Sequence, residues 1–261
     1  MARVDLTSIR ARRVVLPVLL LLMLTLALGL RTAVGETIPA GVTLLAQLAD
    51  RGDADAQYGL GTWYMENHAS QSELEQARDW LLQAARQQHV HAMFRLGVML
   101  NRFDSLRDEG QSMTWVRGAA EAGLADAQAL FGMYLFQGLD GSTPDCTAAA
   151  GWLEKADAVG HETAQSNLVW VLATCPVEGQ RDGSRALRLA FDQVYRRGMK
   201  TANQMDNLAA AYAAAGDFLS AEVAQREALA MEEDPEVKAI FQEHLDSYLK
   251  REAWVEHPTP R

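Results

Sequence analysis

The chain of 261 residues has two cysteines, Cys146 and Cys175, and this pair is the first candidate for chemistry. Each lies in a connection between two predicted helices, and we expect both connections on the same edge of a helix array. In an oxidising compartment, a disulfide that closes this loop of about 30 residues would contribute roughly 3–4 kcal/mol on the chain-entropy model. Two interpretations stay open, a Cys146–Cys175 bond and two buried thiols.

Three other short patterns resemble functional motifs but favour structural interpretations. His89 and His91 would point about 200° apart on one helix, with no carboxylate or cysteine at ligand spacing, so we expect no metal site there. Arg51-Gly52-Asp53 resembles an adhesion tripeptide, but Gly52 already serves a predicted turn. Residues 140–145 resemble a calcium loop that lacks the acidic residue at its twelfth position, which indicates a long turn.

The sequence contains no recognisable catalytic motif. It has no phosphate loop, dinucleotide fingerprint, H-E-x-x-H, G-x-S-x-G or C-x-x-C pattern. We therefore expect no catalytic residues, no cofactor and no metal, and the chain is predicted not to be an enzyme.

The charge distribution argues against nucleic acid as a partner. Residues 1–35 hold five of the 24 Lys and Arg but one of the 34 Asp and Glu, so the remainder carries a net charge of −14. Such a surface repels phosphate backbones, and we expect no Lys/Arg cluster beyond the N-terminal segment to reverse this locally.

The first 35 residues predict export. Four arginines precede an apolar run at residues 14–30, the order of a signal peptide or signal anchor. As a helix the run would span about 26 Å, slightly short of a bilayer core. Ala33 and Gly35 suit cleavage before Glu36, whereas Arg31 is unusual for a cleaved signal. Either way, the positive-inside bias sends the remainder out of the cytoplasm, so we expect a periplasmic protein or one anchored in the inner membrane through residues 14–30.

The rest of the chain is built from an internal repeat. The segment Asp55–Gly61 recurs at 91–97, at 126–132 and weakly at 163–169, with spacings of 36, 35 and 37 residues. Trp80, Trp115 and Trp152 follow the first three copies, and a small residue stands three positions before each. Small residues let adjacent helices approach closely, so the period predicts stacked helix pairs. Gly52, Gly123 and Gly160 are predicted to end helices, and Ser72 with Glu75 to form a capping box.

This pattern resembles the Sel-one-like repeat, a variant of the tetratricopeptide repeat. Its motif A-x-x-x-L-G-x-x-Y, then A-x-x-W-x-x-x-A-A, fits the first copy best, from Ala56 to Ala85. The resemblance implies an all-α fold, a right-handed α-solenoid of stacked antiparallel helix pairs behind the N-terminal hydrophobic segment. The expected divisions are a signal peptide or anchor at 1–35, about four repeats at 36–190, a tetratricopeptide-like unit at 191–234, and a capping helix with its tail at 235–261.

The resemblance also implies where a partner binds. In tetratricopeptide proteins the first helix of each pair lines a concave groove. We transfer to this sequence the positions of the first helix that point into the groove, away from the second helix. They give the candidate partner-binding residues Tyr58, Met65, Phe94, Arg102, Met133, Phe136 and Trp170. If exposed, most of them would form an apolar stripe that suits a protein or peptide.

Two classes of function follow. The first is an exported, periplasmic or membrane-tethered scaffold that binds a protein or peptide through this groove. The alternative is an envelope enzyme or enzyme inhibitor built on the same solenoid, which would need titratable groups converging in a closed pocket.

Overall fold

The computed structural model describes residues 40–67 and 70–256, and every regular element within those ranges is helical. The α-helices run in this order: α2 (Ala40–Asp50), α3 (Ala54–Asn67), α4 (Gln71–Arg86), α5 (Val90–Arg102), α6 (Glu109–Glu121), α7 (Ala125–Gln137), α8 (Cys146–Ala158), α9 (Ala164–Thr174), α10 (Gly183–Phe191), α11 (Ala202–Ala214), α12 (Phe218–Met231) and α13 (Pro235–Leu249). Three short turns complete the list: η1 (Asp104–Leu106), η2 (Leu139–Gly141) and the π-helical turn η3 (Asp192–Arg196). The prediction of an all-α repeat array is confirmed.

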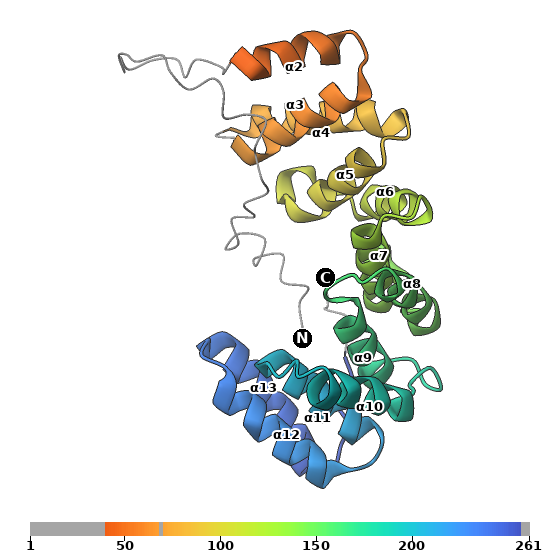
Figure 1. The fold of residues 1–261 in the computed structure, drawn as a ribbon, viewed down its shortest axis with the longest axis vertical. Coiled ribbons are helices and arrows are strands. Elements are labelled where there is room, and N and C mark those ends of the chain that lie inside the picture. The colour runs from red at the N-terminus through yellow and green to blue at the C-terminus, as the bar shows by residue number, and fades with distance from the viewer. Residues whose placement is uncertain (1–39, 68–69, 257–261) are drawn as a thin grey trace.

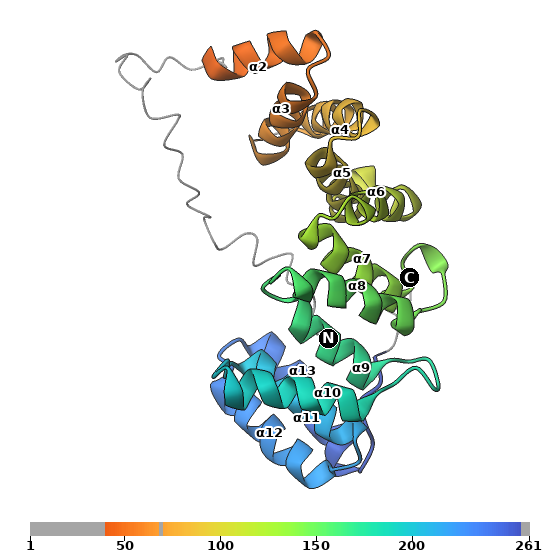
Figure 2. The same cartoon turned by 45° about the vertical axis from the view of Figure 1, so that its right-hand side comes forward.

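The helices stack as successive pairs along one long axis. Figure 1 shows them in chain order from α2 at one end to α12 and α13 at the other, and Figure 2 shows the same succession from another side. Each first helix packs on its own second helix, as α3 does on α4 and α5 on α6, and first helices also contact one another, as α9 does α11. The first helices therefore form one layer of the array.

The predicted signal or anchor at residues 1–35 lies outside the described residues. Within residues 40–67 and 70–256, no helix combines the length and the apolar character that a bilayer crossing needs.

Turn chemistry sets the ends of the helices. Gly52, Gly123 and Gly160 all have positive φ, at 90°, 92° and 80°, which confirms the three predicted turns. The predicted capping box is displaced by two residues. Ser70 caps α4 and Glu73 closes the box, so α4 begins two residues earlier than a cap at Ser72 would place it.

Each of the first three pairs is locked by one glycine. A Cβ built on Gly61, Gly97 or Gly132 would lie 2.8, 2.6 or 2.9 Å from a side-chain atom of Leu81, Val116 or Leu153. It would also lie 3.0–3.1 Å from a backbone carbonyl oxygen of the second helix. Only hydrogen fits there, so the glycine sets how closely the two helices approach.

The recurring tryptophans occupy equivalent places. Trp80, Trp115 and Trp152 are half-buried and pack against clusters shared with preceding helices, and the Trp152 ring meets Phe131 edge to face at 5.4 Å. Each tryptophan stands one position before the residue that meets the glycine, so the two side chains point about 100° apart on the second helix. One side chain packs within the unit and the other packs towards the preceding helices.

Candidate partner-binding surfaces

The predicted stripe is only partly accessible. Tyr58 and Phe94 are half-buried and Arg102 is exposed. In contrast, the expected exposure is wrong for four members of the set, which lie in the core with these exposed fractions: Met65 9%, Met133 2%, Phe136 2% and Trp170 2%. The accessible members all lie on α3 and α5.

Later elements cover the buried members. Met133 and Phe136 share one apolar cluster with Cys146 and Trp170, which joins α7, α8 and α9. Trp170 in turn lies 5.4 Å from the His244 ring of α13, so the last helix returns to cover α9. A groove transferred repeat by repeat could not anticipate the cover of Trp170, because α13 lies outside the repeats.

The accessible end carries a compact aromatic and charged group on α3 and α5. The Tyr58 ring stacks on His89 at 4.7 Å and lies 6.1 Å from His91. His89 caps α5 by accepting the Ala92 N–H through Nδ1, while its Nε2 lies 3.0 Å from Asp55 Oδ1. We call this surface the first-helix face. It consists of Tyr58, Phe94 and Arg102 with Asp55, His89 and His91.

The Asp–His contact recurs further along the array. Asp126 Oδ1 lies 3.2 Å from His161 Nε2, in the same register as Asp55 and His89 two units earlier. The hydrogen bond from His161 lowers the pKa of Asp126, against the opposing effect of burial. Two acid–imidazole pairs therefore join neighbouring units on this edge, the first unit to the second and the third to the fourth. His91 and Leu124 stand at the corresponding positions between them. Among the described residues no group of three or more potential ligands is placed to hold a metal ion.

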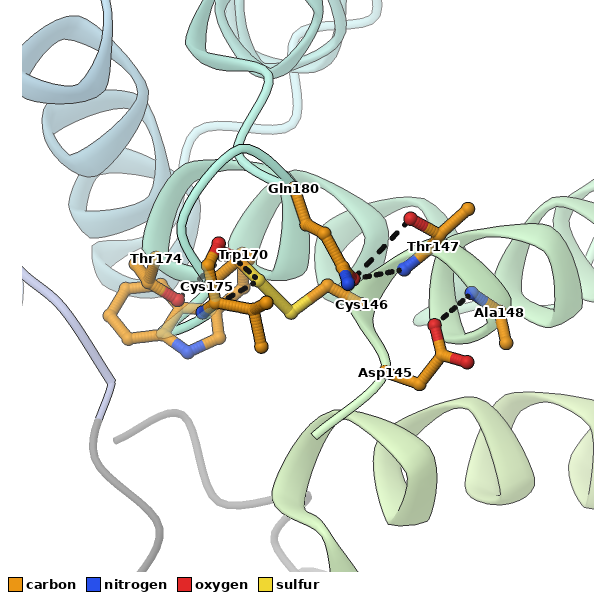
Figure 3. The surroundings of a disulfide bond; sticks show 9 residues. Asp145, Cys146, Thr147, Ala148, Trp170, Thr174, Cys175 and Gln180 are labelled. Carbon is orange, nitrogen blue, oxygen red and sulfur yellow. Dashed lines mark hydrogen bonds between the residues drawn. A yellow bond between two sulfur atoms is a disulfide. The ribbon is translucent and has the colours of Figure 1, made fainter. Parts of the chain in front are cut away.

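Cys146 and Cys175 are joined by a disulfide, with Cα atoms 6.1 Å apart. Figure 3 shows how neighbouring residues fix both sides of the bond. Asp145 caps α8 by accepting the Ala148 N–H, and Gln180, from the loop after Cys175, accepts hydrogen bonds from the N–H and hydroxyl of Thr147. The bond therefore ties the start of α8 to the end of α9, across two consecutive units.

A buried polar cluster holds the last three helices together. His244 Nδ1 lies 2.8 Å from Asp206 Oδ1, and Gln225 donates to that same oxygen at 2.7 Å. The exposed fractions of Asp206, His244 and Gln225 are 2%, 0% and 0%. Burial and, secondarily, the Asp206 charge raise the pKa of nearby Tyr248 well above its ordinary value, so its phenol stays neutral.

The segment after α13 fastens this cluster to the repeats. Trp254 lies 4.5 Å from the His244 ring, and the Glu256 N–H donates to the Thr174 carbonyl at the end of α9. We call residues 250–256 the C-terminal strap. Sequence reasoning gave the tail no role, although an aromatic residue beyond a capping helix is a usable signal.

A hollow of about 530 Å³ lies between α10 and α11. Its lining residues come from α10, η3 and α11: Ser184, Leu187, Arg188, Phe191, Arg196, Tyr212 and Ala215. Gly183 makes the close helix approach possible, because a Cβ there would lie 2.4 Å from the Ala214 carbonyl. Phe191 and Tyr195 are exposed at 44% and 55%, with ring centroids 4.6 Å apart.

The hollow corrects the expected absence of a basic cluster. Residues 181–200 contain six Lys and Arg but two Asp and Glu, inside a chain that is otherwise acidic. The helical spacing of α10 brings Arg188 to the hollow and η3 brings Arg196. A local count of charges along the sequence would have found this run.

The geometry defines a class of protein, an elongated array of antiparallel helix pairs of the tetratricopeptide type. Within that class, the Sel1 repeat family model matches residues 54–89, 90–124 and 125–156. The chain therefore carries three consecutive Sel1 repeats, which confirms the predicted type of repeat. The matched units are the pairs α3–α4, α5–α6 and α7–α8.

Solved structures support the same fold. A Sel1 repeat protein from Oxalobacter formigenes is 21% identical, with a TM-score of 0.57 over 76% of this chain and 81% of its own. The protein c5321, a protective antigen of uropathogenic Escherichia coli with an SLR fold, is 24% identical with a TM-score of 0.56, over 84% of this chain but 46% of its own length. A comparison with curated proteins found no match.

Proposed function

We propose that this chain is an exported, periplasmic or membrane-tethered scaffold that binds a protein or peptide partner through its first-helix face. The single observation that carries the proposal is the partial exposure of Tyr58 and Phe94 beside the exposed Arg102, on adjacent first helices. Tyrosine and arginine are enriched among the few residues that carry most of the binding energy in protein interfaces. Sel1 repeats, like other helical repeats, present such faces on a rigid array.

Export rests on two independent features. Residues 1–35 have the order of charges and apolar residues that signals and anchors share. The Cys146–Cys175 bond fits an oxidising compartment, in which structural disulfides persist. We propose that residues 14–30 anchor the chain in the inner membrane if they are not cleaved, with the repeats outside the cytoplasm.

The burial of the Asp206–His244 pair favours a binding role for the chain over a catalytic one. The Asp206–His244 pair has the residue types of a general base and its orienting acid, but both side chains are enclosed by α9, α11, α12 and the C-terminal strap. A catalytic base must come within hydrogen-bond reach of its substrate. We therefore assign this pair a structural role.

Site-specific crosslinking in intact cells tests the proposal. A photoreactive amino acid at Phe94 or Arg102 should give the same discrete crosslinked partner, and one at Gln76, on the exposed side of α4, should not. Arg102→Glu should weaken recovery of that partner with an unchanged melting temperature. Equal crosslinking from all three positions would contradict the first-helix face.

Export is tested separately by labelling thiols in cells before lysis. We expect neither Cys146 nor Cys175 to react with an alkylating reagent unless a reductant is added first. Two free thiols in a fraction that stays with the cytoplasm would contradict export without bearing on the binding face.

A further inference from the structure

We infer that the hollow between α10 and α11 is a second binding site, and that it takes a peptide segment of a partner protein in which apolar side chains are flanked by carboxylates. The site lies outside the first-helix face, so it adds to the proposed function and does not depend on it.

The lining has the composition of a recognition pocket. Leu187, Phe191 and Tyr212 supply an apolar floor, and two guanidinium groups, Arg188 and Arg196, stand beside it. A volume of about 530 Å³ falls within the range of pockets that bury a ligand group. Apolar surface with a small number of charged groups fixes both the depth and the orientation of a bound side chain.

The two arginines of the hollow, Arg188 and Arg196, favour a negatively charged ligand. Arg196 already lies 3.6 Å from Asp192, which also meets Arg197 at 3.0 Å. Within the described residues, by contrast, no acidic side chain forms an ion pair with Arg188. An arginine that faces a hollow without a carboxylate can accept a bidentate carboxylate from outside.

Charge also disfavours residues 1–39 of the chain itself as the occupant. They contain five arginines against Asp5 and Glu36, so they would bring positive charge to a hollow that already holds Arg188 and Arg196. An acidic segment from another molecule is the complementary ligand.

The surface continues beyond the hollow, which favours a peptide. Phe191 lines the hollow and its ring also lies against that of Tyr195, at a tilt of 42°; Tyr195 is more than half exposed. The π-helical turn η3 carries both Tyr195 and Arg196, so it places an aromatic group and a cation on the same edge. One apolar side chain could enter the hollow while its neighbours along the peptide contact this edge.

Fluorescence anisotropy tests the inference with the full chain, purified in a non-ionic detergent. The probes are labelled peptides in which a Leu-Phe, Leu-Leu or Trp-Leu pair is flanked by two glutamates on each side. We expect at least one to bind at least about tenfold more tightly than its counterpart with lysines for glutamates. Arg188→Glu and Ser184→Trp should each weaken that binding at least about tenfold, the first by repulsion and the second by filling the hollow.

Two matched variants separate this site from the rest of the chain. Arg86→Glu makes the same charge change on α4, and Arg102→Glu alters the first-helix face; both should bind the peptides as the wild type does. The inference is wrong if no glutamate peptide exceeds its lysine counterpart, or if Arg188→Glu and Ser184→Trp keep wild-type affinity with unchanged helical circular dichroism. It is also wrong if sedimentation shows a dimer that Arg188→Glu dissociates, because the occupant is then a second copy.

Discussion

The two halves of the array are held together by different chemistry. From α3 to α8, each helix pair is closed by a glycine that lets the second helix approach, at Gly61, Gly97 and Gly132. From α9 to α13 the equivalent positions are Val169 and Ala209. Here the helices are held together by the Cys146–Cys175 bond, the Asp206–His244 pair and the C-terminal strap.

This difference shows how far repetition determines the structure. The first half repeats one contact, so its stability is close to a sum over units and their neighbours. The second half depends on residues that occur once and lie far apart in the sequence, such as Asp206 and His244. Loss of one such residue should therefore affect several helices together.

The largest expected effect is in the second half. Asp206→Ala leaves His244 and the Gln225 amide buried without their shared acceptor, and removing one member of a buried pair costs about 3–5 kcal/mol. Denaturant unfolding should show this loss, and hydrogen exchange should show it first in α11, α12 and α13. Glu243→Ala, on the exposed side of α13, should change stability by less than about 0.5 kcal/mol. Equal loss of protection in α3 to α6 would contradict the comparison.

The disulfide should have the next largest effect. Cys146→Ala with Cys175→Ala is expected to cost about 3 kcal/mol, because the unfolded chain regains the freedom of the closed loop. Thermal unfolding with and without a reductant measures it: the reductant should lower the melting temperature of the wild type and leave that of the double variant unchanged. A reductant effect of equal size in both proteins would assign the loss to another cause.

A smaller effect is expected for the glycine lock. Gly97→Ala places a Cβ 2.6 Å from Val116 Cγ2 and 3.0 Å from the Ser112 carbonyl oxygen, and overpacking of this kind costs about 1–3 kcal/mol. Gly151→Ala is the matched control, since nothing lies within 4 Å of its new Cβ. In α8 it should stabilise by about 0.5–1 kcal/mol through helix propensity. The same sign of change in both variants would show that close approach does not hold the first half together.

The smallest change in stability is expected for the acid–imidazole pairs, Asp55–His89 and Asp126–His161. Asp126→Asn removes a charge whose folded-state pKa is lowered by the His161 hydrogen bond. A carboxyl with a lowered folded pKa stabilises above its unfolded pKa and loses that contribution as pH falls through the folded value. Because Asp126 is largely exposed, the wild type should exceed the variant by at most about 1 kcal/mol at neutral pH.

The measurement is the difference in unfolding free energy between the two proteins, followed from neutral pH down through the aspartate range. This difference in unfolding free energy should shrink towards zero as the pH falls. Glu162→Gln, one residue from His161, serves as the control and should show no such convergence. A difference that grows on acidification would mean that the pair does not stabilise the fold.

The repeated half of the fold could be predicted from the sequence because its determinants are local and periodic. Glycine, a small residue and tryptophan return at fixed spacing, and each marks the same contact in every unit. The last helix begins at Pro235, where the capping helix was expected, because Asp234 is its N-cap and proline suits the first helical position. The capping box shifted because Ser70 and Ser72 offer the same motif two residues apart.

The partner-binding set could be predicted only in part, because exposure depends on what covers a helix. Tyr58, Phe94 and Arg102 lie on α3 and α5, whose main contacts within residues 40–67 and 70–256 are with α2, α4, α6, η1 and each other. Trp170 is buried by α13, which the repeat pattern does not describe. The buried pair left a weaker signal: Asp206 stands between Met205 and Asn207 in an alanine-rich helix, and His244 adjoins Leu245 on an apolar face. Polar residues at such positions need partners, but their sequence does not say which ones.

The glycine contacts lie inside single hairpins, from Gly97 in α5 to Val116 in α6, for example. Each of these hairpins therefore carries its own close contact. We expect the array to tolerate duplication or deletion of α3–α4 or α5–α6 as a whole unit, whereas α7–α8 also holds Cys146 and is tied to α9. From α7 onward the contacts that hold the array together reach across several helices, so a change in the number of units is expected to be tolerated only at the α3–α6 end.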